Sequence, residues 1–142
     1  MDEAFWDSSA LVPICVQQPA TPSALALSAQ YEMAVWWSAP VEMRAAFARL
    51  LRMGQLDQGG HSHALVALDR LRSTWWEVEP DEPLRLQAEG LVDRFPLKAA
   101  DAQQLAAALA WCLGKPDGRA FLSRDKQLLV AARQLGFLTV SV

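Results

Sequence analysis

Four acidic residues are spaced so that an α/β fold could bring them together. Asp7 follows the apolar run Ala4-Phe5-Trp6, Glu42 follows a second apolar run, and Asp101 and Asp125 lie in the last third of the sequence. Carboxylate oxygens with no Cys or His among them favour Mg²⁺ or Mn²⁺ over Zn²⁺. Such metal sites leave positions for water and substrate phosphate, so the chemistry they suit is phosphodiester hydrolysis.

Each acid also has an ordinary structural interpretation. Asp7, Asp101 and Asp125 could cap helices, and Glu42 could be a first-turn acid favoured by the helix dipole. Together, however, clustered carboxylates repel one another and raise the pKa of one or more of the group. A divalent cation would remove that cost, so the combination favours a metal site.

The apolar pattern predicts the elements that must position these acids. Strands are expected at residues 4–6, 33–37, 75–78, 120–123 and 137–142. Helices are expected to begin near residues 10, 21, 40, 64, 83, 101 and 125. This alternation predicts one α/β domain over residues 1–142, with a mostly parallel five-stranded sheet sandwiched between helices.

The expected sheet gathers three of the acids at one edge. Elements that follow parallel strands begin at the same edge, which places Asp7, Glu42 and Asp125 there. The helix of Asp101 precedes a strand instead, so this acid must approach from another direction, and spacing alone does not place it. Asp101 shares a helix face with Leu105, which predicts a core-facing carboxylate.

The chain resembles a known family through four motifs in order, from about Phe5 to the C-terminus. They are Phe5-Trp6-Asp7-Ser8-Ser9-Ala10-Leu11, Ser38-Ala39-Pro40-Val41-Glu42 with Arg49, Leu97-Lys98-Ala99-Ala100-Asp101-Ala102 with Leu105-Ala106, and Phe121-Leu122-Ser123-Arg124-Asp125 with Leu128 and Ala131-Ala132. The motifs look like those of PIN-domain ribonucleases and, more narrowly, of the VapC toxins of bacterial toxin–antitoxin pairs.

The resemblance implies a role for each matching residue. Asp7, Glu42 and Asp101 would bind metal, Asp125 would complete the site, and Ser8 or Ser9 would support the cluster. It also implies an α/β/α fold, Mg²⁺- or Mn²⁺-dependent cleavage of RNA by metal-activated water, a homodimer, and inhibition by a small antitoxin protein.

Two departures from the family pattern concern substrate contacts more than the acids. Many relatives carry a Lys where this chain has Pro13-Ile14-Cys15, and Ser123 stands where Thr is common. Three basic residues are candidates for guiding the RNA backbone, with ordinary solvated charges as the alternative: Arg49, Arg124 and Lys126.

Composition limits the classes of function. The chain has 142 residues, 52% apolar and 20% charged, which is typical of one folded domain. The net charge of −3 excludes the strongly basic surface of a nonspecific nucleic-acid coat protein. Of the 16 acids, four are assigned to the site, which leaves 12 against 13 Lys and Arg, so an RNA substrate remains compatible.

The expected location is the cytosol. The acidic start Met1-Asp2-Glu3 does not resemble a secretory signal, and the uncharged stretch 8–31 contains prolines that disfavour a membrane span. Cys15 and Cys112 form no CxxC pair and are expected to be reduced and partly buried.

Other patterns have competing interpretations. His61-Ser62-His63 could bind a metal, but its glycine-rich surroundings favour a loop or an ordinary pair of surface histidines. Four tryptophans could stack on bases, but their apolar runs favour core packing, with some at a dimer surface: Trp36, Trp37, Trp75 and Trp76. Two further functions compete with the nuclease, a receiver-like Mg²⁺-binding module and a PIN domain that only binds its partner.

Overall fold

Five parallel strands form the centre of the molecule in the order β3-β2-β1-β4-β5. The computed structural model describes residues 1–142. The strands are β1 (Asp2–Trp6), β2 (Tyr31–Trp36), β3 (Trp76–Val78), β4 (Ala120–Ser123) and β5 (Leu138–Ser141). The predicted α/β class is confirmed, and the order differs from the 2-1-3-4-5 arrangement of receiver-like domains.

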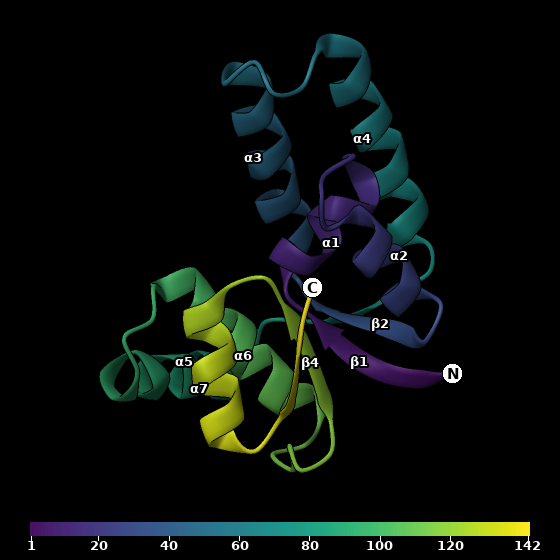
Figure 1. Ribbon diagram of the computed structural model, residues 1–142. Coiled ribbons are helices and arrows are strands. Elements are labelled where there is room, and N and C mark those ends of the chain that lie inside the picture. The colour runs from purple at the N-terminus through teal and green to yellow at the C-terminus, as the bar shows by residue number, and fades with distance from the viewer.

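Seven helices cover the two faces of the sheet (Figure 1). They are α1 (Ser8–Cys15), α2 (Thr21–Ser28), α3 (Ala39–Arg52), α4 (Gln58–Arg72), α5 (Glu82–Arg94), α6 (Ala99–Trp111) and α7 (Lys126–Leu135). Helices α1 to α4 group on one side and α5 to α7 on the other. None of them combines the length and apolar character that crossing a membrane requires.

Alternating side chains of the central strands build the two cores. Phe5 and Phe121 belong to the core beneath α5 to α7, and their stacked rings have centroids 5.7 Å apart. Trp6 and Leu122 belong to the core beneath α1 to α4. Because successive side chains point to opposite faces, strands buried on both faces appear in the sequence as continuous apolar runs.

The central position of β1 creates the crevice at which the site forms. The chain leaves β1 toward β2 on one side, while β4 pairs with β1 on the other. In doubly wound sheets, ligands bind at the carboxyl ends of the strands where the order reverses in this way. The ends of β1 and β4, at Trp6 and Ser123, flank that point.

One predicted helix begins earlier than expected. Gly59, Gly60 and His61 lie in the first turn of α4 and not in a loop, because the Asp57 carboxylate caps the helix by accepting a hydrogen bond from the Gly60 amide. The loop expected around His61-Ser62-His63 is therefore wrong, whereas the alternative of a surface pair agrees with a partly exposed His61 and an exposed His63. The helix-capping signal of Asp57 outweighs the low helix propensity of two adjacent glycines.

Candidate functional site

The structure brings the charges of four carboxylates to one edge of the sheet. We call Asp7, Glu42, Asp101 and Asp125 the acid edge. Asp7 follows β1, Glu42 lies in the first turn of α3, Asp101 lies in the first turn of α6, and Asp125 directly precedes α7. Hydrogen bonds join Asp7 to Ser123 at the end of β4 and Glu42 to Gln104 of α6, and the charges of Glu42 and Asp101 add to burial in raising the pKa of Asp7.

Asp7 is the buried member of the acid edge. Its side chain is 4% exposed, and its amide continues the sheet by donating to the Leu122 carbonyl at 2.9 Å. Its carboxylate does not cap α1 and instead accepts hydrogen bonds at Oδ2 from Ser9 Oγ, 2.5 Å away, and Ser123 Oγ, 2.8 Å away. Burial raises the pKa of Asp7 to about 6 against the lowering effect of these two hydroxyls.

The two hydroxyls beside Asp7 also fix the loop after β4. Ser9 Oγ accepts a hydrogen bond from the Arg124 amide, and Ser123 Oγ accepts one from the Asp125 amide, each at 3.0 Å. Each hydroxyl thus accepts from the loop and donates to Asp7. The supporting role expected of Ser9 corresponds to this geometry.

Glu42 is oriented by three donors from three elements. Ser38 Oγ donates to Oε1 at 2.9 Å, Ser8 Oγ donates to Oε2 at 2.9 Å, and Gln104 Nε2 donates to Oε2 at 2.8 Å. Gln104 Nε2 also lies 2.8 Å from Ser8 Oγ, and the side chain is 1% exposed. The carboxylate is therefore fixed between α1, α3 and α6.

Asp101 and Asp125 complete the acid edge from the other side of the sheet. Partial burial raises the pKa of Asp101, the charges of Asp125 and Glu42 raise it further, and Lys98 opposes the shift. Asp101 accepts no hydrogen bond that caps α6. Asp125 does cap α7, because its Oδ1 accepts from the Leu128 amide at 3.0 Å.

The donor chemistry of the acid edge fits a hydrated hard cation. The available ligands are carboxylate and hydroxyl oxygens, which Mg²⁺ and Mn²⁺ prefer. No three Asp, Glu, His or Cys side chains are grouped closely enough to enclose an ion by themselves. Mg²⁺ commonly takes only one or two carboxylates and retains water, so an open set of acids suits it.

A cavity of about 490 Å³ opens beside the acid edge and contains two of the basic candidates. Arg49 of α3 and Arg124 line it together with Ser9, which donates to Asp7. Arg124 Nη1 donates to Gln18 Oε1 at 3.1 Å. The third candidate, Lys126, is exposed at the start of α7 and does not line this cavity.

Sequence reasoning missed Gln104 as a site residue. It lies on α6 in an alanine-rich stretch, next to Gln103, and nothing in its spacing distinguishes the buried glutamine from the exposed one. A signal was available in the helical period, since a residue three positions after Asp101 lies near the same face. Ser38 was quoted only as part of a motif, although it binds Glu42 directly.

The prediction of core packing holds for two of the four tryptophans, and the other two are exposed, as the predicted dimer surface would require of some. Trp36 is buried and Trp75 is partly buried against the α1 to α4 core, but Trp37 is 53% exposed and Trp76 is 59% exposed. Trp37 follows the last residue of β2, and Trp76 lies on the edge strand β3. Continuous apolar runs do not show where the covering helices end.

Comparison with known proteins identifies the fold. No protein-family model and no curated protein matches the sequence. Among solved structures, PAE2754 from Pyrobaculum aerophilum has a TM-score of 0.67 at 19% identity, covering 98% of this chain and 90% of that chain. FitAcB from Neisseria gonorrhoeae has a TM-score of 0.64 at 15% identity, covering 96% of this chain and 95% of that chain.

A third similar structure is VapBC2 from Rickettsia felis, bound to a DNA fragment from their promoter. Its TM-score is 0.64 at 8% identity, and the match covers 97% of this chain and 97% of that chain. At such low identities the likeness establishes a shared fold over nearly the whole length of both chains. It agrees with the PIN-like α/β architecture expected from the sequence motifs.

Proposed function

We propose that this protein is a metal-dependent endoribonuclease with a PIN-like fold and the toxin component of a VapBC-type toxin–antitoxin system. The observation that carries the proposal is the buried Asp7 at the end of the central strand. Burial and the charges of Glu42 and Asp101 raise its pKa, so the folded protein keeps a carboxylate where its charge is costly. Strongly perturbed pKa values cluster at functional sites, which supports a functional role for Asp7.

In the proposed reaction the acid edge binds Mg²⁺ or Mn²⁺. The ion would supply a positive charge for the phosphoryl oxygens and lower the pKa of water that attacks the RNA phosphodiester. Asp7, Glu42 and Asp101 are the proposed ligands, and because no three acids group closely enough to enclose an ion, some of them would bind it through its water. Asp125 is proposed to bind a second ion or orient water, while Ser8 and Ser9 keep Glu42 and Asp7 in position.

RNA as the substrate is supported by the basic cavity on one side of the acid edge. Arg49 and Arg124 line that cavity, and neither contributes to the two ion pairs of the molecule. Guanidinium groups match phosphate oxygens in geometry as well as charge. A strand whose phosphates contact these arginines would pass the carboxylates.

The direct test is cleavage of a structured RNA pool in EDTA, Mg²⁺ or Mn²⁺, by the wild-type protein and Asp101→Asn. A matched control is Asp69→Asn, which makes the same change at an exposed position on α4. We expect metal-dependent cleavage that Asp69→Asn retains and Asp101→Asn loses. Cleavage by Asp101→Asn at the wild-type rate would refute the assignment.

The partner proposals rest on the family resemblance. We propose a small antitoxin protein and a homodimer, which co-expression with the neighbouring small reading frame and light scattering would test. Calorimetric titration with Mn²⁺ distinguishes the remaining alternative, because a domain that only binds its partner need not retain a metal site. The strand order argues against the receiver-like alternative.

A further inference from the structure

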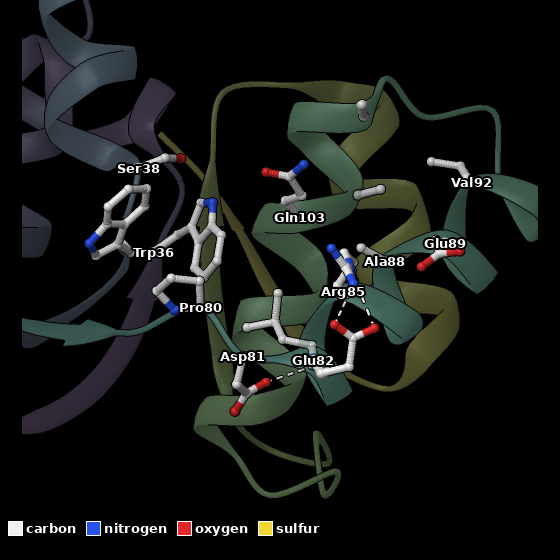
Figure 2. Close-up of a pocket in the computed structure, with 14 residues that line it drawn as sticks. Trp36, Ser38, Pro80, Asp81, Glu82, Arg85, Ala88, Glu89, Val92 and Gln103 are labelled. Atoms are coloured by element: carbon white, nitrogen blue, oxygen red, sulfur yellow. Dashed lines mark hydrogen bonds and ion pairs between the residues drawn. The ribbon is translucent and has the colours of Figure 1, made fainter.

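A second cavity has a volume of about 530 Å³ and shares Ser38 with the surroundings of Glu42. It opens between the end of β2, the chain before α5, and helices α5 and α6 (Figure 2). Ser38, whose hydroxyl donates to Glu42, is part of its wall, and so is Gln103, the neighbour of the buried Gln104. A ligand in this cavity would therefore lie next to the groups that orient Glu42.

An exposed indole forms part of the wall. Trp37 is 53% exposed, while its backbone amide is fixed by a hydrogen bond of 3.0 Å to the Val78 carbonyl. The core therefore leaves a large share of this residue uncovered, in the wall of a cavity that combines apolar and charged side chains. Aromatic rings in such positions provide stacking surfaces for unpaired bases.

The charges around the cavity disfavour phosphate and favour N–H donors. Asp81, Glu82 and Glu89 line it with a single cation, Arg85, and that guanidinium pairs with Glu82 (Figure 2). Asp81 Oδ1 caps α5 by accepting from the Leu84 amide, and Oδ2 has no partner in the protein. Carboxylates accept hydrogen bonds from the exocyclic amino groups of bases.

We infer that this cavity binds one unpaired, amino-bearing base of a single-stranded RNA, stacked on Trp37 and next to the phosphodiester to be cut. The inference rests on the proposed function, since it assumes that RNA passes the acid edge. The arginine-lined cavity draws on α1 and α3, and the Trp37 cavity on the end of β2 with α5 and α6, so the first would contact phosphate and the second a base. The Trp37 cavity would then contribute to sequence preference.

The test is binding of a labelled single-stranded hexanucleotide in EDTA, where no metal-dependent cleavage occurs, measured by fluorescence anisotropy. Trp37→Ala should bind at least tenfold more weakly than wild type, which corresponds to about 1.4 kcal/mol, and Trp37→Phe should restore much of the loss. The matched control is Trp76→Ala, which removes a similarly exposed indole outside the cavity and should change affinity less than twofold.

A set of hexanucleotides, each with one abasic position, locates the bound base. The wild-type protein should bind one of these RNAs, abasic at a single position, more weakly than the intact hexanucleotide. Trp37→Ala should bind that abasic RNA and the intact RNA equally. Hexanucleotides with uracil at that position should bind the wild-type protein more weakly than those with adenine, guanine or cytosine there. Equal affinities for Trp37→Ala and Trp76→Ala, or no RNA binding by wild type, would overturn the inference. The inference would also be overturned if N-acetylarginine amide quenches Trp37 fluorescence and AMP does not, because the cavity would then accept a cationic side chain.

These outcomes separate the inference from the nuclease proposal. Binding in EDTA depends on Trp37 and requires no turnover, whereas the Asp101→Asn experiment measures cleavage alone. A protein that binds RNA through Trp37 and does not cut it would refute the nuclease and retain the base site. If the protein cleaves RNA with metal but Trp37→Ala does not weaken RNA binding, the nuclease proposal would stand and the base site would be refuted.

Discussion

At the scale of single residues, the charge of Asp7 destabilises the folded protein in the absence of metal. Its pKa is raised by burial to about 6 in the folded state, against an ordinary value of 3.8. Between these values the folded protein binds more protons than the unfolded chain. The free energy of unfolding therefore falls as pH rises through this window, by on the order of 3 kcal/mol in total at 1.36 kcal/mol per pKa unit.

Asp7→Asn removes this dependence. In EDTA we expect the variant to exceed wild type in the free energy of unfolding at pH 7.5, by about 1 to 3 kcal/mol, and to differ little near pH 4, where the wild-type carboxyl is protonated. Urea denaturation at several pH values measures the difference. A difference that stays constant from pH 4 to pH 7.5 would show that the Asp7 charge carries no such cost.

Gln104 gives a prediction that the sequence motifs do not contain. Gln104→Leu removes the donor shared by Glu42 and Ser8, so Glu42 loses one of its three hydrogen bonds. Loss of a residue that orients a metal ligand typically reduces metal affinity or activity about 10- to 100-fold. We expect a loss of this size in Mn²⁺ affinity by calorimetry.

The matched control for Gln104→Leu is Gln134→Leu, at an exposed position near the end of α7. Stability should change little in Gln104→Leu, since Gln104 Oε1 is already buried without a partner and the leucine removes it. If a folded Gln104→Leu protein binds Mn²⁺ as tightly as wild type, Gln104 serves only to pack the core and does not orient a metal ligand.

The acids and their partners Ser8 and Ser9 could be selected from the sequence, but the partner Gln104 could not. Asp7 is recognisable because an apolar strand stops at a carboxylate, which is a local change of character. Gln104 acts across the molecule, 96 residues from Ser8, and such a contact depends on how α6 crosses the end of the sheet. No local pattern encodes that crossing.

At the scale of elements, Asp125 combines two roles that substitutions can separate. Its Oδ1 caps α7, and its charge raises the pKa of Asp101. Asparagine caps helices about as well as aspartate, whereas alanine costs about 1 kcal/mol. Asp125→Asn should therefore keep wild-type stability or exceed it slightly, and Asp125→Ala should lose roughly 1 kcal/mol.

Both Asp125 variants should lose RNA cleavage if the charge is needed for the reaction. Thermal unfolding and the cleavage assay, performed on the two proteins in parallel, measure the two roles independently. Equal destabilisation of Asp125→Asn and Asp125→Ala would mean that the charge, and not the cap, stabilises α7. Cleavage retained by Asp125→Asn alone would show that the cap is the functional role.

Strands were easier to predict than the edges of the layers that cover them. All five predicted strands are present, and burial on both faces explains the continuous apolar signal of the central strands, whereas the edge strands β3 and β5 are only partly buried. The exposure of Trp37 depends on where α5 and α6 end above the sheet, and that is a tertiary property. The start of α4 is difficult to recognise in the sequence because Gly59 and Gly60 resemble a turn, although Asp57 caps the helix.

At the scale of the whole molecule, the acid edge draws on both layers around the sheet. Glu42 belongs to α3 in the α1 to α4 layer, whereas Asp101 begins α6 and Asp125 precedes α7 in the opposite layer. Their repulsion therefore acts between two layers that the sheet and the hydrogen bonds of Gln104 to Ser8 and Glu42 hold together at this edge. A cation bound here would reduce that repulsion and connect the two layers.

Divalent metal should accordingly stabilise the whole fold. Free Mn²⁺ at a hundred times its Kd should add about 2.7 kcal/mol to the free energy of unfolding, provided that the unfolded chain does not bind it. Differential scanning calorimetry should show a Tm that rises with Mn²⁺ and returns in EDTA, with KCl of equal ionic strength as the control. Asp69→Asn should show the same rise, and Asp101→Asn should lose most of it because one of the proposed ligands is gone. A rise of equal size in Asp101→Asn would place the ion elsewhere on the protein, and the acid edge would then be a cluster of charges that the fold tolerates without a metal.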